Sequence, residues 1–148
     1  MFSIFKRKSG VFPVESKWVL YQGQNDGKPL FVRRNDSAKQ LMVNSNYDTI
    51  IGIAVPFFNP TDEGFAKEEE LSIFGHIEDE LFAQFEKDMA AIVVLIITTG
   101  GMREFISYAQ TPMLIEERIN EIKQKFPEYD FQVYIEEDKK WNLYQQFK

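Results

Sequence analysis

The sequence predicts an α+β fold in which two helices cover one face of a mainly antiparallel sheet. The expected element order is β-α-β-β-α-β, the split βαβ order of a ferredoxin-like sandwich, preceded by an N-terminal β-hairpin. Three observations lead to this order: a hairpin signal, two segments with helical periodicity, and a continuous apolar strand between them. The length of 148 residues predicts a single domain over 1–148, with 1–14 as a flexible or loosely packed segment.

The hairpin is predicted by two β-rich runs at 18–23 and 28–34. Asp26-Gly27 lies between them, and a type I′ turn favours this dipeptide because both of its central residues need positive φ. The mostly polar residues 35–46 are expected to form a loop. In an alternative α+β arrangement the hairpin is an integral part of the sheet and the strand order differs.

The first helix is predicted from about residue 66 to 88, after a strand over 47–57 with two largely apolar faces. The run 91–97 is continuously apolar and predicts a central strand that is covered on both sides. A Gly-Gly turn then leads into a strand over 103–109. The apolar residues of the helix recur at spacings of three and four, which places them on one face: Leu71, Phe74, Ile77, Leu81, Phe85 and Met89.

The second helix is predicted to begin at Thr111-Pro112, with threonine as the N-cap and proline at the first helical position. It should end before Pro127. Alternating apolar and polar residues over 131–136 then predict a strand with one solvated face. A short closing helix follows from aromatic residues spaced three apart, namely Trp141, Tyr144 and Phe147.

Composition excludes several classes of function. The chain has no cysteine and one histidine, so thiolate metal sites, cysteine nucleophiles and Ser-His-Asp chemistry lack the necessary residues. We predict no cofactor and no metal site, since His76, Asp79 and Glu80 on one helix face lack a further strong ligand. No apolar run approaches the roughly 20 residues of a membrane-spanning helix. Without cysteine or a signal-peptide pattern, a cytoplasmic protein is expected.

The charge is unevenly distributed along the chain. The net charge is −6, but residues 61–90 contain 10 acidic and 2 basic residues. A field of this sign repels phosphate backbones and weighs against nucleic-acid binding. If the first helix turns its apolar stripe inward, Glu69, Asp79 and Glu80 face solvent. They are therefore the predicted surface for a protein partner that presents Lys and Arg.

Arg103 is the main candidate for a binding residue. It begins a strand whose alternate residues must pack, and a buried guanidinium there needs a carboxylate, for which Glu78 and Asp138 are the natural candidates. In one hypothesis this ion pair ties the C-terminus to the sheet. In the other, Arg103 binds a ligand in a pocket rimmed by Tyr108 and Trp141, because arginine with aromatic residues is typical of anion and peptide sites.

Two motifs are more specific than these periodicities: Thr98-x-x-Gly101-x-Arg103-Glu104-Phe105 with Tyr108, and Asp138-x-x-Trp141-x-x-Tyr144. Together with Trp18-x-x-Tyr21-x-Gly23, Ile51-Gly52-Ile53 and Glu78-Asp79, they resemble the bacterial domain-of-unknown-function family 695. The resemblance runs from about residue 16 to the end. It implies no established activity. It does imply an association, because family members are sometimes joined to a domain similar to the B-type regulator of ribonuclease E activity, an acidic ferredoxin-like inhibitor of that nuclease.

These observations lead to two functional hypotheses. The first is a cytoplasmic binding or regulatory module that acts through a protein partner. The alternative is a small enzyme with an acidic pocket around Arg103, Tyr108, Glu78 and Asp138. A binding module should present a flat aromatic or acidic patch, whereas an enzyme should have a concave site in which the pKa of a carboxylate is strongly shifted.

Overall fold

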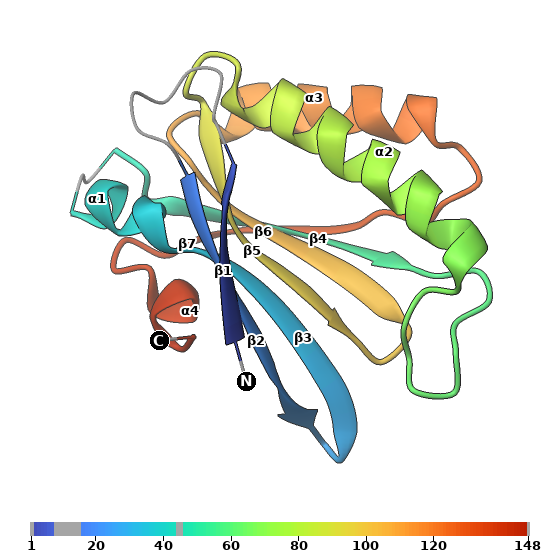
Figure 1. Cartoon of the computed structure of the whole chain (residues 1–148). Coiled ribbons are helices and arrows are strands. Elements are labelled where there is room, and N and C mark those ends of the chain that lie inside the picture. The colour runs from blue at the N-terminus through green and yellow to red at the C-terminus, as the bar shows by residue number, and fades with distance from the viewer. Residues whose placement is uncertain (1, 8–15, 44–45, 148) are drawn as a thin grey trace.

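The computed structural model describes residues 2–7, 16–43 and 46–147. They form one seven-stranded sheet with the strand order β1-β2-β3-β5-β6-β4-β7, in which every neighbouring pair is antiparallel (Figure 1). The expected loose segment 1–14 lies largely outside the described residues. Its residues Phe2–Arg7, however, form the edge strand β1, which pairs with β2 (Ser16–Asn25).

The second part of the sheet has the predicted ferredoxin-like topology. Strands β4 and β5 are parallel to each other and are separated by β6, which pairs with both, as in a split βαβ unit. Strand β3 pairs with β5, so the N-terminal hairpin is an integral part of the sheet, as in the alternative arrangement. The ferredoxin-like order of the later strands is retained as well. The elements are β3 (Lys28–Asn35), β4 (Thr49–Pro56), α2 (Glu68–Glu86), β5 (Ala91–Thr99), β6 (Met102–Ala109), α3 (Pro112–Lys125) and β7 (Gln132–Glu137).

The hairpin turn confirms the sequence prediction, and the connection after it corrects one. Asp26 and Gly27 both have positive φ, at 52° and 78°, as a type I′ turn requires. The segment expected to be a loop instead contains a 3₁₀ turn at Asp36–Ala38 and the short helix α1 (Lys39–Met42). Ala38 is buried in a hydrophobic cluster, and this packing stabilises a turn that the polar sequence does not signal.

Helices α2 and α3 lie side by side over one face of the sheet, which we call the helix face (Figure 1). The main hydrophobic core fills the space between these helices and the sheet. Strand residues such as Ile51, Ile53 and Phe105 form its floor. The helices contribute Phe74, Ile77, Leu81 and Phe85 from α2, and Ile115, Ile119 and Ile122 from α3.

Two residues of the predicted helical stripe lie outside this core. Leu71 is 49% exposed, because it lies near the start of α2 beside a cleft described below. Met89 follows the end of the helix and has a left-handed backbone with φ of 63°. It packs against the opposite face of the sheet. The helical periodicity therefore correctly predicts which residues in the middle of α2 are buried in this core. It wrongly includes one residue at each end of the stripe.

The opposite face, which we call the terminal face, is covered by α1 and by the C-terminal segment with α4 (Asn142–Gln145) (Figure 1). Its core contains Tyr108, Trp141 and Tyr144 together with Ile50. Strand β4 thus buries residues on both of its faces, as the sequence predicts.

Strand β5 is buried on both faces, and it carries an irregularity that the sequence does not signal. Ile92, Val94 and Ile96 are at most 4% exposed, which confirms the predicted central strand. The register between β5 and β6 shifts between Val93 and Leu95, so Val94 and Leu95 both face the terminal-face core. The buried carboxylate of Glu86 accepts a hydrogen bond of 3.0 Å from the backbone N–H of Val93.

In the described part of the chain, no helix combines the length and apolar character needed to cross a membrane.

Candidate functional site

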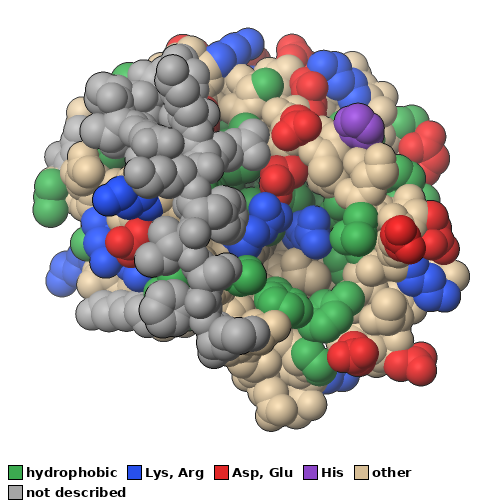
Figure 2. All heavy atoms as spheres, in the orientation of Figure 1, with side chains coloured by type: hydrophobic (Ala, Val, Ile, Leu, Met, Phe, Trp, Pro, Cys, Tyr) green, Lys and Arg blue, Asp and Glu red, His purple; other side chains and the backbone are tan. Residues whose placement is uncertain are grey.

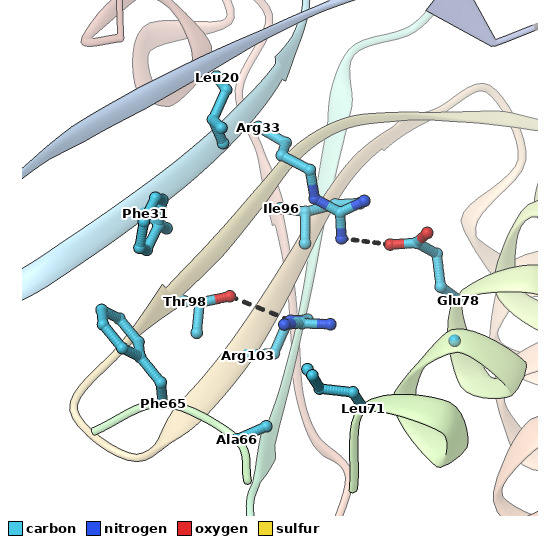
Figure 3. Close-up of a pocket in the computed structure, with 11 residues that line it drawn as sticks. Leu20, Phe31, Arg33, Phe65, Ala66, Leu71, Glu78, Ile96, Thr98 and Arg103 are labelled. Carbon is cyan, nitrogen blue, oxygen red and sulfur yellow. Dashed lines mark hydrogen bonds and ion pairs between the residues drawn. The ribbon is translucent and has the colours of Figure 1, made fainter. Parts of the chain in front are cut away.

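A cleft of about 460 Å³ opens on the helix face, between the N-terminal half of α2 and strands β3, β5 and β6. Figure 2 shows basic and acidic side chains gathered in a hollow beside a group of hydrophobic ones. Among the described residues, the cleft is lined by three charged ones, Arg33, Glu78 and Arg103, and by Leu20, Phe31, Phe65, Ala66, Leu71, Gly75, Ile96 and Thr98 (Figure 3).

Arg33 reaches the cleft from β3. Successive strand residues point to opposite faces, so Arg33 lies on the helix face and its neighbour Arg34 on the terminal face. The Arg33 guanidinium forms an ion pair with the Glu78 carboxylate of α2 (Figure 3). Both side chains are largely buried, at 27% and 13% exposed.

Arg103 comes from β6 and is held in a different way. It lies directly opposite Thr98 in the register of β5 and β6, and its Nε donates a hydrogen bond of 3.0 Å to the Thr98 hydroxyl. Its guanidinium lies 5.5 Å from the ring centre of Phe74 and 5.9 Å from that of Phe57. These contacts fix the position of the guanidinium, and they do not neutralise its charge.

The predicted ion pair between Arg103 and Glu78 or Asp138 is not found. Glu78 forms its ion pair with Arg33, and Asp138 lies on the terminal face. Burial and the nearby charge of Arg33 lower the pKa of Arg103 to about 10, while the Glu78 carboxylate partly opposes this shift. Among the described residues, two guanidiniums thus share one carboxylate inside the cleft.

The segment between β4 and α2 closes one end of the cleft and is held in place by Glu70. This buried carboxylate accepts hydrogen bonds of 3.1 Å from the backbone N–H groups of Phe58 and Asn59, and one of 2.7 Å from the Tyr129 hydroxyl. Burial raises the pKa of Glu70, but these hydrogen bonds together lower it below its ordinary value. Glu70 therefore serves a structural role as an ionised acceptor.

The same segment packs closely against the turn between β5 and β6. The Gly101 N–H donates a hydrogen bond of 3.0 Å to the Gly64 carbonyl oxygen. Gly64 has φ of 89°, and a Cβ there would lie 3.0 Å from the Gly101 nitrogen, so other residues would be strained at this position. This packing holds Phe65 at the cleft, where its ring centre lies 5.2 Å from that of Phe31.

The remaining predicted site residues lie on the terminal face, away from Arg103. The Trp141 ring stacks on Tyr108 with ring centres 4.1 Å apart, and Trp141 Nε1 donates to the Tyr47 carbonyl oxygen at 2.6 Å. The Tyr108 hydroxyl donates to Asp138 Oδ2 at 2.8 Å. Burial and the Asp138 carboxylate raise the pKa of Tyr108. The chain does have a C-terminal anchor, but it is built on Tyr108 instead of Arg103.

Asp138 also shapes the backbone of this anchor. Its carboxylate accepts hydrogen bonds from the N–H groups of Asn142 at 2.9 Å and Leu143 at 3.3 Å. Trp141 has a left-handed backbone with φ of 55°, which directs its ring onto Tyr108. The structure thus separates the predicted site residues by the thickness of the sheet: Arg103 and Glu78 lie on the helix face, and Tyr108, Asp138 and Trp141 on the terminal face.

A comparison with protein-family models identifies the family of this chain. The model of a family of unknown function, DUF695, matches residues 16–147. The chain belongs to this family. No curated protein and no solved structure matches the chain. The match includes every residue that lines the cleft and every residue of the C-terminal anchor.

Within this DUF695 chain, the predicted acidic surface of α2 is smaller than expected. Glu69 and Asp79 are exposed, as predicted. Glu80 is instead in an ion pair of 2.6 Å with Lys125 of α3, and this pair lowers the pKa of Glu80. No group of at least three His, Asp or Glu side chains arranged to hold a metal ion occurs among the residues that the structure describes.

Sequence reasoning missed Arg33, Phe31 and Phe65 as members of the site. One signal was available for Arg33: two consecutive arginines in a predicted strand must point to opposite faces, so one of them has to face the helices. No comparable signal identifies Phe65, because its position depends on the packing of its loop against the turn between β5 and β6.

Proposed function

We propose that this protein is a binding module and that the cleft holding Arg33 and Arg103 takes an anionic group of its ligand. One observation carries this proposal: two guanidiniums line a partly enclosed cleft and share the Glu78 carboxylate. The Nε of Arg103 is engaged by Thr98, while its two terminal nitrogens donate no hydrogen bond to the described residues. A guanidinium placed this way is ready to donate two parallel hydrogen bonds to an anion.

Electrostatics supports an anion at this position. The pKa of Arg103 falls to about 10 because of burial and the charge of Arg33, so the cleft holds its second cation at a cost in free energy. A bound anion would remove that cost. A group in a cleft whose pKa is strongly shifted by burial and by a specific charged neighbour is typical of functional sites.

The hypothesis of an enzyme built around Arg103, Tyr108, Glu78 and Asp138 has less support. These residues lie on both faces of the sheet, so one substrate cannot contact them all. Tyr108 and Asp138 are engaged with each other, and Asp138 also binds the backbone of the C-terminal segment.

Thermal unfolding of the full-length protein in a panel of anions, at constant ionic strength, tests the proposal. We expect at least one organic anion to raise Tm in a saturable manner, since a ligand at 100 times its Kd stabilises the folded state by about 2.7 kcal/mol. Arg33→Gln and Arg103→Gln should lose this shift. Lys139→Gln is the control, because it removes one positive charge from a 65% exposed side chain outside the cleft. This variant should retain the Tm shift. A shift that persists in both arginine variants contradicts the proposal.

A protein partner with a basic surface is a second candidate, favoured by the outward position of Glu69 and Asp79 on α2. Interactions of this kind weaken as salt shortens the Debye length from about 10 Å at 0.1 M to about 3 Å at 1 M. Proteins that the native chain captures at low salt should not be captured by the double variant Glu69→Lys, Asp79→Lys. The same proteins captured by both chains would exclude this surface. Glu116→Lys, Glu121→Lys on α3 is the matched control because both residues are exposed.

A further inference from the structure

We infer that the ligand of this cleft is a small monocarboxylate with a compact apolar or aromatic body. The inference rests on the proposed function, and it adds the chemical class of the ligand. Its three supports are the charge balance of the cleft, the orientation of Arg103, and a glycine in α2 that leaves space beside the arginines.

The charge balance favours a singly charged anion. Among the described lining residues, Arg33 and Arg103 contribute two positive charges, Glu78 contributes one negative charge and the others are uncharged, so this part of the lining carries a net charge of +1. A carboxylate neutralises this charge. A phosphate monoester carries about −1.5 to −2 at neutral pH and would leave excess negative charge in a partly buried site.

The orientation of Arg103 favours a planar group with two acceptor oxygens. Because Nε donates to Thr98, the plane of the guanidinium is fixed and its two terminal nitrogens form the edge that remains. Figure 3 shows this end of Arg103 pointing away from Thr98, into the space near Arg33 and Glu78. Two parallel N–H groups match the two oxygens of one carboxylate.

Apolar side chains form the rest of the cleft. Phe31, Phe65 and Leu20 line one side, and Leu71 of α2 lines the other with about half of its surface exposed (Figure 3). A volume of about 460 Å³ is within the range of small-molecule sites. A ligand with its carboxylate on the terminal nitrogens of Arg103 would therefore place its body on the α2 side of this apolar lining, beside Leu71 (Figure 3).

Gly75 provides independent support. It lies within α2, where glycine is the least favourable residue after proline, and it lines the cleft. A Cβ at this position would meet no atom within 4 Å, so packing of the protein itself does not require glycine. Its position suits a binding site, because a larger side chain would project into the space that the ligand needs.

Isothermal titration of the full-length protein with chosen probes tests the inference. The probes are 3-phenylpropionate, its neutral amide, acetate and phenyl phosphate. We expect 3-phenylpropionate to bind saturably. The amide should bind at least about tenfold more weakly, because it lacks the charge-assisted hydrogen bonds. Acetate should also bind at least about tenfold more weakly, because it lacks the apolar body.

Two variants locate the site. Arg103→Gln should weaken 3-phenylpropionate binding by about tenfold or more. Gly75→Leu should fold at least as stably as the native chain, since leucine is a better helix former, and should abolish binding by filling the cleft. Gly75→Leu thus remains informative if Arg103→Gln does not fold. Lys139→Gln is the control for net charge and should bind like the native protein.

Several results would overturn the inference. If phenyl phosphate binds as tightly as 3-phenylpropionate, or tighter, the anion is not a carboxylate, although the proposed anion site stands. If acetate binds equally well, the ligand does not need an apolar body. If Gly75→Leu binds normally, the ligand does not occupy the space beside Gly75, and its placement in the cleft is wrong. A blocked tripeptide ending in phenylalanine that binds far more tightly would reassign the site to polypeptide C-termini. If none of these anions binds, the proposed function fails as well.

Discussion

The two faces of the sheet contain similar residues, yet they use them differently. On the terminal face the polar tips of the aromatic residues are paired within the protein: Trp141 with Tyr47, Tyr108 with Asp138, and the Tyr144 hydroxyl with the Asn35 carbonyl oxygen at 2.7 Å. On the helix face, the charged residues in the described lining of the cleft are two arginines and one carboxylate.

This difference shows what distinguishes an anchor from a candidate site. Arginine, carboxylate and aromatic residues occur on both faces, so composition alone does not separate the two. The distinction lies in whether folding already provides the partners. The anchor is complete without a ligand, whereas the cleft has more donors than the described residues use.

The largest expected effect is on the terminal face. Trp141→Ala removes a fully buried ring that stacks on Tyr108, and should lower the free energy of unfolding by about 3–5 kcal/mol. Urea unfolding measures the loss. Any anion binding in the cleft should be unchanged in the folded fraction, because the sheet separates the two sites. A loss below about 1 kcal/mol would mean that the C-terminal segment is not an integral part of the fold.

Tyr108→Phe tests the hydroxyl of the anchor, which donates to Asp138 and accepts a long hydrogen bond of 3.5 Å from the Tyr144 N–H. The ring and its stacking on Trp141 are retained, while Asp138 loses the hydroxyl that binds it at 2.8 Å. We expect the free energy of unfolding to fall by about 1–2 kcal/mol, since the hydrogen bond is to a charged group. Ligand binding in the cleft should not change. If Tyr108→Phe altered cleft binding instead, the separation of the two faces would be contradicted.

The ion pair of Arg118 with Asp88 on the helix face gives a prediction for the pH dependence of stability. Arg118 binds Asp88 through two hydrogen bonds, and this pair lowers the pKa of Asp88 from 3.8 to about 2. Because the folded-state pKa is depressed, the pair stabilises the protein above about pH 4 and this contribution is lost as the pH falls towards 2. Urea unfolding at a series of pH values should show this loss in the native chain. It should be smaller in Asp88→Asn, which lacks the titrating group.

The smallest effect on stability is expected for Arg103→Met. Because burial and Arg33 disfavour the charge of Arg103, its removal should leave the free energy of unfolding unchanged or raise it by about 1 kcal/mol. Anion binding should be lost in the same variant. A large loss of stability would instead indicate that Arg103 is a structural residue, and the contrast between the two faces would disappear.

The elements of this fold are largely predictable from local sequence. The spacing of Phe74, Ile77 and Leu81 indicates one helix, and Thr111-Pro112 marks the start of the other. Asp26-Gly27 identifies the hairpin turn. These signals are readable because each depends on the conformational preferences of neighbouring residues or on the repeat of one helix or strand. The order of the elements then limits the topology to few choices.

The partners of the charged residues were determined only by tertiary structure. The face on which Arg33 or Arg103 lies follows from alternation along a strand, but its partner depends on residues that are distant in sequence. Arg33 reaches Glu78 across 45 positions, and Arg103 is placed beside Thr98 by the register of β5 and β6.

Sequence alone therefore determined the long helices α2 and α3, the strands β2 to β7 and the presence of an inward-facing arginine, but not β1 or α1. The packing of α2 over the sheet decided that Glu78 pairs with Arg33. It also decided that Leu71 borders a cleft. On the terminal face, the docking of the C-terminal segment made Tyr108 the residue that anchors the C-terminus. Both outcomes depend on how whole elements dock, because the contacts join segments that are distant in sequence.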